Sequence, residues 1–141
     1  MGQEKNSRCM GDAMQYVVLS GISPQVIKDL EHDKIKTIEI RSPHNFLSAI
    51  ETDAGDIIFL TSTSPSDIRT GTIGVIAKII GKQVAMQRMI QKTDSYEEAE
   101  VQMARLQLEM KGNARVRQAK YYVIGEAIVV DADEMLFFEG R

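Results

Sequence analysis

Three Ser-Pro pairs, each following a run rich in β-branched residues, constrain the fold most strongly. Serine is a favoured cap residue at the start of a helix, and proline fits the first helical position. The pairs therefore predict helices over residues 23–33 and 42–51 and a short helical turn over 64–71. Since apolar residues recur at helical spacing in the first two segments, we expect each of these helices to bury one face.

Most of the remaining chain has strand character. Residues 104–112 alternate apolar and polar side chains, and glycines interrupt a long apolar run at positions expected to be bends or bulges, namely Gly71, Gly74 and Gly81. The predicted strands cover residues 14–22, 36–42, 56–63, 71–90, 104–112, 114–125, 126–133 and 134–140. A helix is predicted over 94–103, where Asp94 and Glu97 have the spacing of a capping box. This order predicts an α+β fold, with the strands in a closed or nearly closed barrel and short helices packed on it.

Length and composition narrow the class of protein. The 141 residues are 43% hydrophobic and 26% charged, as in soluble globular proteins, and no apolar run approaches the ~20 residues of a membrane helix. We expect one domain over 14–141 and a flexible polar tail over 1–13, without a secretory signal. The single cysteine, Cys9, predicts a reducing compartment and hence a cytoplasmic protein. Two histidines and one cysteine cannot form a Cys/His zinc set, so neither a metal nor a cofactor is expected.

The charge is unevenly spread along the chain. A net charge of −3 argues against generic, charge-driven DNA binding. Residues 78–120, however, hold nine Lys or Arg against five Asp or Glu, whereas 121–141 hold one against five. A local basic face is therefore compatible with the sequence.

The segment KTIEIRS (36–42) admits two interpretations. Period two places Ile38 and Ile40 on one face of a strand and Thr37, Glu39 and Arg41 on the other. Burying two isoleucines stabilises the fold by ~4 kcal/mol, which explains the strand without any function. The polar face is then either a solvated Glu39–Arg41 pair, contributing ~0–1 kcal/mol, or part of a binding site.

The order of helix, motif strand, turn and apolar strand resembles the ASC-1 homology (ASCH) domain of the PUA-like superfamily. Lys36, Glu39 and Arg41 match its G-x-K-x-x-E-x-R signature, and Gly55–Asp56 before an apolar strand matches the next element. Lys34 stands where the signature has glycine. The resemblance implies a small barrel with a cleft lined by the motif side chains, and an RNA or modified-nucleoside ligand.

Other segments add candidate binding residues. The Ser/Thr-rich stretch 61–72 offers the hydroxyls of Thr61 and Ser62 to a ligand, although turn and cap chemistry is the alternative. The stretch RVRQAKYY (115–122) combines cations with an aromatic ring, a combination suited to single-stranded RNA, or else forms a solvated strand face with one core tyrosine. The residues predicted to bind a nucleotide-sized ligand are Lys36, Thr37, Glu39, Arg41, Thr61 and Ser62. The residues predicted to bind RNA are Arg115, Arg117, Lys120 and Tyr121.

Over 14–141 the chain is also similar to an uncharacterised archaeal family found in methanogens, domain-of-unknown-function family 473. The segments that carry this resemblance are LSGIS, TIEIRS, GDIIFLTSTS, GTIGVIAK and ARLQLE. The resemblance implies an archaeal lineage and no particular activity.

Three functions follow from these patterns. The first is a PUA/ASCH-like module that binds RNA, a nucleoside or a nucleotide. The second is a small amidohydrolase acting on acylated nucleosides, because some ASCH domains that resemble this chain use the motif lysine, here Lys36, with a threonine at the position of Glu39 and a distant glutamate. The third is a protein-interaction subunit without a small ligand. No membrane partner is expected, and the sequence carries no indication of the oligomeric state.

Overall fold

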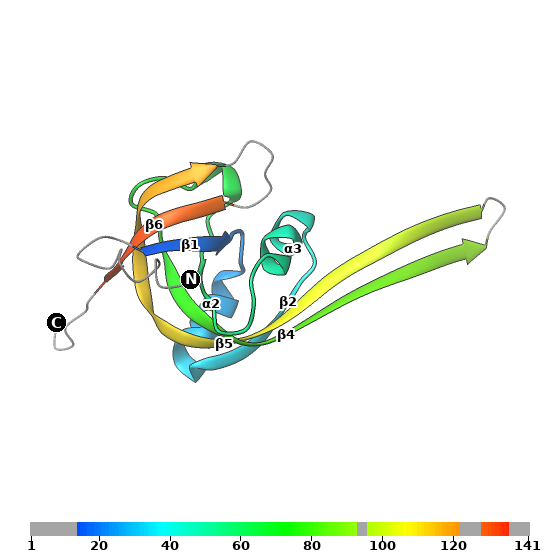
Figure 1. Cartoon of the computed structure of the whole chain (residues 1–141), viewed down its shortest axis with the longest axis horizontal. Helices are drawn as coiled ribbons and strands as arrows, with labels where there is room; N and C mark the ends of the chain where they lie inside the picture. The colour runs from blue at the N-terminus through cyan, green and yellow to red at the C-terminus, as the bar shows by residue number, and fades with distance from the viewer. Residues whose placement is uncertain (1–13, 93–95, 122–127, 136–141) are drawn as a thin grey trace, which may run out of the picture.

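The computed structural model describes residues 14–92, 96–121 and 128–135. Over these residues the chain forms six strands, two α-helices and one 3-10 helix. In chain order they are β1 (Met14–Leu19), α2 (Pro24–Asp33), β2 (Ile35–Ile40), α3 (Pro43–Ile50), β3 (Ile57–Leu60), η1 (Pro65–Asp67), β4 (Ile73–Lys92), β5 (Tyr96–Tyr121) and β6 (Ile128–Met135). The arrangement is a mixed, sheet-rich fold (Figure 1).

The helices begin where the Ser-Pro pairs predict. The Ser23 hydroxyl accepts a hydrogen bond from the Gln25 backbone N–H at 3.2 Å, and the Ser42 hydroxyl accepts one from Asn45 N–H at 3.2 Å. Proline follows each cap at the first helical position. The third pair, at Ser64, begins only the three-residue η1.

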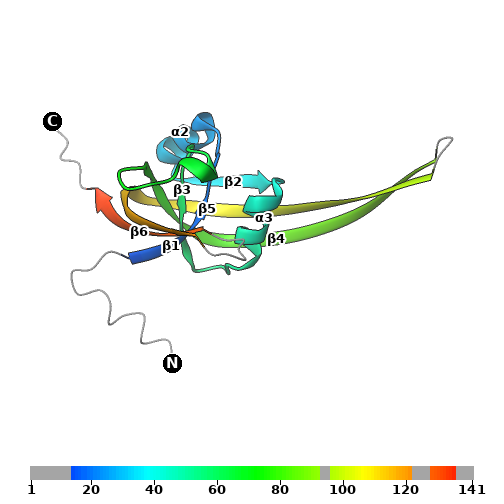
Figure 2. The same ribbon diagram turned by 90° about the horizontal axis from the view of Figure 1, so that it is seen from above.

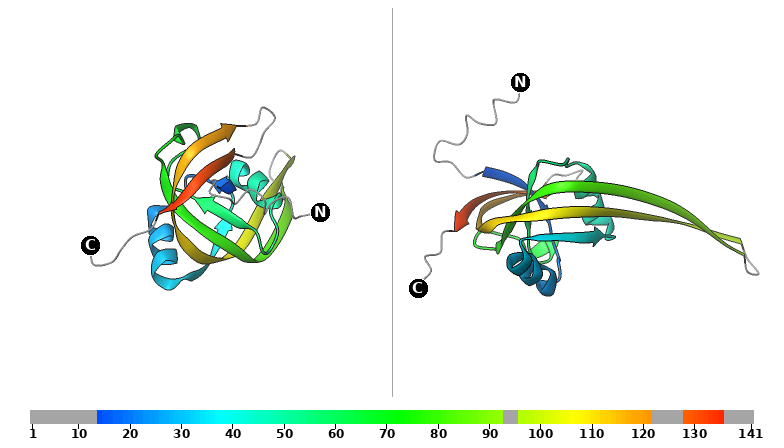
Figure 3. Two further views of the ribbon diagram at one scale, coloured as in Figure 1. Left: turned by 60° about the vertical axis from the view of Figure 1, so that its left-hand side comes forward. Right: turned by 90° about the horizontal axis from the view of Figure 1, so that it is seen from below.

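The strands pair in the order β2-β5-β4-β3-β1-β6, and β6 pairs with β5 as well. The pairing of β1 with β3 is parallel, and the other five pairings are antiparallel. The circuit β5-β4-β3-β1-β6 therefore returns to β5, and Figure 3 shows the strands curving round in this way. Among the described residues β2 pairs with β5 alone, so it is an edge strand outside the circuit.

Buried side chains form two clusters on the two faces of the strands. On β3, Ile58 and Leu60 belong to the first cluster and Phe59 to the second, as period two requires. The first cluster lies between the sheet and the helices, because it includes Leu30 of α2 and Phe46 of α3. The second is built by strand residues together with Ile68, which follows η1. Its members are Tyr16, Val18, Phe59, Ile68, Ile76, Ala114, Val116, Ile128, Val130 and Ala132.

Gly71 and Gly81 lie at irregularities as predicted, whereas Gly74 is regularly paired with Ala114 and is neither a bend nor a bulge. A register shift between β4 and β5 lies immediately before Gly81, which confirms the expected bulge there. Gly71 has a φ of 98° in the turn before the strand. Gly74 lies against β3, where a Cβ would meet the Leu60 carbonyl oxygen and lie 2.7 Å from the Phe59 ring. A side chain at that position would push the two strands apart.

The outer parts of β4 and β5 form a two-stranded arm, defined here as residues 85–92 and 96–103. It extends far beyond the rest of the molecule (Figures 1 and 2). The helix predicted over 94–103 is wrong from Tyr96 onward, because that segment pairs with β4 from Lys92↔Tyr96 inward. The hydrogen bonds of a strand ladder outweigh the local helix propensity of its three glutamates and of Ala99.

The remaining predicted strands differ in length from the strands of the structure. The strands predicted over 104–112 and 114–125 are parts of one strand, β5, which ends at Tyr121. The strand predicted over 126–133 corresponds to β6, and that over 56–63 shortens to Ile57–Leu60. The predicted tail, residues 1–13, lies outside the described residues. The strand predicted over 134–140 also lies outside them beyond Met135.

Candidate functional site: a groove beside the edge strand

Strand β2 carries the KTIEIRS motif at the edge of the sheet. Ile38 and Ile40 are 7% and 3% exposed and pack in the first cluster, which confirms their predicted orientation. Thr37, Glu39 and Arg41 are exposed. The strand is thus held on one face by the core and presents a polar face to solvent.

A groove of about 450 Å³ runs beside β2. Its walls come from the turn after β1, the first turn of α2, all of the motif strand and the start of α3. The lining residues are Gly21, Ile22, Ser23, Val26, Lys36, Thr37, Ile38, Glu39, Ile40, Arg41, Ser42 and Asn45. The volume falls within the range of small-ligand sites, ~300–1,000 Å³.

Lys36 reaches this groove although it shares the parity of the buried isoleucines. Its Nζ lies 3.5 Å from Oδ2 of Asp29 on α2, and the side chain is 29% exposed. A hydrogen bond from the Gln25 amide, at 2.9 Å, and the charge of Lys36 hold the pKa of Asp29 below its usual range. The lysine is therefore a cation held at the groove wall by α2.

Glu39 joins two arginines. Its Oε1 accepts a hydrogen bond from Arg41 at 3.1 Å, and its Oε2 accepts one from Arg105 at 2.9 Å. The bond from Arg105, and next the bond from Arg41, lower the pKa of Glu39. The carboxylate thus holds the guanidinium group of Arg41, which lines the groove, and joins it to Arg105 on the neighbouring strand β5.

Arg105 is the site residue that the sequence analysis missed. It lies directly opposite Glu39 in the pairing of β2 with β5. The alternation over 104–112 placed it on the polar face of its strand, together with Gln107 and Glu109. Alternation gives the face of a residue but not its cross-strand neighbour, because the register depends on distant turns.

Both α-helices begin at the groove. The capping residues Ser23 and Ser42 line it, so the partial positive charge of each helix N-terminus lies at the groove wall. Asn45 fixes the start of α3, since its Oδ1 accepts from Ser20 N–H at 3.0 Å and its Nδ2 donates to the Ser20 carbonyl at 2.8 Å. This buried pair of bonds ties one wall of the groove to the end of β1.

The other predicted binding residues lie elsewhere. Thr61 is buried, and its hydroxyl donates to the Ile73 carbonyl at 3.1 Å and accepts from the Thr63 N–H at 3.2 Å. Ser62 is exposed. Neither is among the described residues that line the groove. As ligand-binding residues they stay a prediction.

The predicted RNA-binding cations lie on the far part of β5, which pairs with β6 instead of β2. Arg115 and Arg117 are exposed, and Nη1 of Arg117 lies 3.7 Å from Oδ1 of Asp133. A register shift between Val116 and Gln118 makes Arg117 a bulge residue. Lys120 and Tyr121 complete the predicted set, and the structure does not describe their side chains.

The described residues contain neither a metal-binding group nor a membrane-spanning helix. Among the described residues no three His, Cys, Asp or Glu side chains are grouped so that they could hold a metal ion. Within the same part of the chain, no helix has the length and apolar character needed to cross a membrane.

Comparison with known proteins shows the family to which the chain belongs. Residues 14–130 match the family described as a protein of unknown function, DUF473. The chain belongs to this family, as the segments in the sequence analysis predict.

The chain is also similar to the uncharacterized protein MJ0105 of Methanocaldococcus jannaschii, a methanogenic archaeon. The two are 33% identical over 105 residues, which cover 74% of this chain and 66% of the relative. The match therefore spans about two thirds of the relative's own length.

Proposed function

We propose that this chain is a PUA/ASCH-like module that binds RNA, or a nucleotide taken from RNA, in the groove beside β2. The observation that carries the proposal is that Lys36, Glu39 and Arg41 line one groove. The pairing circuit β5-β4-β3-β1-β6, with helices outside it, supports the PUA-like barrel. The cysteine usage supports a cytoplasmic module.

The lining suits an anionic ligand with a polar base. Arg41, 63% exposed, can turn toward a phosphate and bind it with two parallel hydrogen bonds. Lys36 and the two helix N-termini add positive potential. Glu39 can accept hydrogen bonds from the amino group of a base. Ile22 and Val26 provide apolar surface for a base or ribose.

We keep the far part of β5 as a proposed accessory RNA contact. Arg115 and Arg117 are exposed there on one strand. A longer RNA that occupies the groove would gain phosphate contacts from them, and these contacts would weaken with salt.

Binding assays with a charge-matched control test the proposal. We expect Lys36→Ala/Arg41→Ala to weaken binding of archaeal tRNA at least ~10-fold, since two direct contacts of ~1 kcal/mol or more are lost. The control Lys28→Ala/Lys111→Ala removes two exposed cations away from the groove lining and should change affinity less than about threefold.

Two results would reject RNA binding in this groove. One is a wild-type protein that binds neither tRNA nor nucleosides; the other is equal binding by wild type and Lys36→Ala/Arg41→Ala. Release of acetate from N4-acetylcytidine that disappears in Lys36→Ala would instead favour the amidohydrolase. Co-purification of a stable protein partner by a chain that binds no nucleotide would favour the interaction subunit.

A further inference from the structure

A second hollow lies across the motif strand from the groove. It has a volume of about 400 Å³ and is lined by Thr37, Gly81, Lys82, Gln83, Arg105 and Gln107. These residues come from β2, β4 and β5, at the level where Gly81 faces Gln107 and Gln83 faces Arg105. The hollow is therefore a polar depression on the sheet, and none of the proposed chemistry above uses it.

The hollow and the groove are joined through β2. Thr37 lines both of them. Glu39, which lines the groove, accepts the 2.9 Å hydrogen bond from Arg105, which lines the hollow. Because β2 is an edge strand, a ligand can cross its free side from one space to the other.

The two linings differ in chemistry. The groove has the helix N-termini and the cations Lys36 and Arg41. The hollow has two exposed amides, Gln83 and Gln107, which can donate to and accept from a base edge. The Arg105 guanidinium lies beside them and can bind a phosphate or stack on a base.

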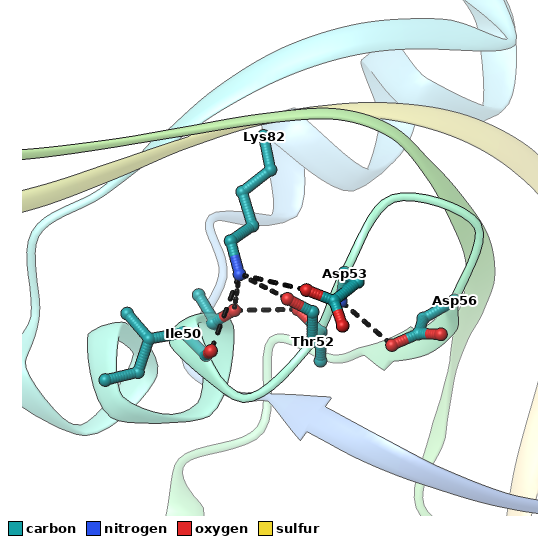
Figure 4. Close-up of polar contacts among 6 residues, drawn as sticks. Ile50, Thr52, Asp53, Asp56 and Lys82 are labelled. Carbon is teal, nitrogen blue, oxygen red and sulfur yellow. Dashed lines mark hydrogen bonds and ion pairs between the residues drawn. The ribbon is translucent and has the colours of Figure 1, made fainter.

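Both cations of this lining are engaged, Arg105 with the Glu39 carboxylate and Lys82 with backbone carbonyls. The Lys82 Nζ donates to the Ala49 and Ile50 carbonyls at 3.3 and 3.4 Å and to the Thr52 carbonyl, as Figure 4 shows. The same Nζ lies 3.9 Å from Oδ1 of Asp53. Lys82 thus holds the end of α3 to β4, and its side chain is only 19% exposed. The Arg105 side chain is 44% exposed and has further N–H groups besides the one that donates to Glu39, so we assign the anion contact of the hollow to Arg105.

The bulge before Gly81 shapes the hollow. A Cβ added at Gly81 would lie 3.4 Å from Oε1 of Gln107, in ordinary contact with that amide. Glycine therefore keeps the space above Gln107 open. Bulges of this kind commonly re-aim side chains beside binding sites.

We propose that the groove and the hollow form one extended site for a single-stranded oligonucleotide of at least two nucleotides. The groove binds the phosphate-bearing end, and Gln83 and Gln107 hydrogen-bond the base of the next nucleotide while Arg105 contacts the linking phosphate. This inference rests on the proposed function and adds a second subsite, the hollow, which selects a strand of at least two nucleotides over a mononucleotide.

A length series tests the inference. Affinities of a mononucleotide, a dinucleotide and a hexanucleotide are measured by titration calorimetry, with RNA and DNA as separate arms. We expect the dinucleotide to bind about tenfold more tightly than the mononucleotide, because one base gains hydrogen bonds in the hollow. Gln107→Ala should reduce this ratio to below about threefold while mononucleotide binding stays unchanged. Gln15→Ala, which removes an exposed amide on β1 away from both linings, is the matched control.

The outcomes separate the two proposals. Equal affinity for all lengths, lost in Lys36→Ala, would overturn the extended site and leave the nucleotide groove intact. An affinity that rises with oligonucleotide length but is unaffected by Gln107→Ala would also overturn it. Absence of binding at every length would overturn both proposals. A length dependence restricted to the RNA arm supports an RNA ligand, and one in both arms supports any single strand.

Discussion

At the scale of single residues, Lys34 shows how the turn before the motif strand is made. It ends α2 with a φ of 71°, and it is the one non-glycine residue of the described chain with a positive φ. Its N–H donates to the Leu30 carbonyl at 2.8 Å. The ASCH signature has glycine at this position, which fits a left-handed cap. Lysine keeps the geometry at a conformational cost.

Lys34→Gly should therefore stabilise the protein. Glycine adopts the left-handed conformation without the Cβ penalty, so we expect the free energy of unfolding to rise by ~0.5–1 kcal/mol in urea titrations. Lys28→Gly, an exposed change inside α2, should lower it by ~1 kcal/mol. Destabilisation by both substitutions would show that the cap is not left-handed in solution.

The ionisation of Glu39 gives a second prediction at this scale. Because Arg105 and Arg41 lower its pKa, Glu39 stabilises the folded state above its unfolded pKa, and this contribution is lost as the pH falls through the folded pKa. In a carboxyl NMR titration, Arg105→Gln should move the Glu39 midpoint upward, and Arg115→Gln should leave it in place. An unmoved midpoint in Arg105→Gln would mean that the cross-strand bond is absent.

The same residues show how much of the candidate site the sequence could predict. The period of KTIEIRS correctly separated the buried Ile38 and Ile40 from the exposed Glu39 and Arg41. It could not supply Arg105, since the register of β2 against β5 is set by tertiary packing. The site could thus be predicted along one strand, but not across two.

At the scale of elements, β2 is a strand with separate tasks for its two faces. Ile40→Ala should lower the free energy of unfolding by ~2–5 kcal/mol, because it leaves a cavity in the first cluster. Arg41→Ala should lower it by less than ~1 kcal/mol, because its ion pair is exposed, yet reduce ligand binding. Thermal and urea unfolding of both variants measure this. If Arg41→Ala unfolds the protein while Ile40→Ala is silent, the strand is inverted.

Elements bounded by strong local signals were predictable. The Ser-Pro caps located α2 and α3. The segment from Tyr96 has helix-forming residues, but its backbone pairs with β4 over a long ladder. A local pattern cannot report such a non-local pairing, so the arm was missed.

At the scale of the whole molecule, the arm extends away from the rest of the chain (Figures 1 and 2). The described cluster members on β4 end at Ile79, and those on β5 begin at Ala104. Replacing residues 86–102 by Asn-Gly, which forms a tight turn between paired Ala85 and Met103, should change the free energy of unfolding by less than ~1 kcal/mol. Calorimetry measures this change. Loss of cooperative unfolding in the shortened chain would show that the arm is part of the folding unit.

The central claim is that nucleotides bind beside β2. Its most direct test is an NMR map of backbone amide shifts as a short single-stranded RNA is added to the labelled protein. The largest shifts should fall within the segments 21–26 and 36–45, which contain the residues that line the groove. Binding with its largest shifts on the far part of β5 or on the arm, with residues 36–45 unchanged, would contradict it.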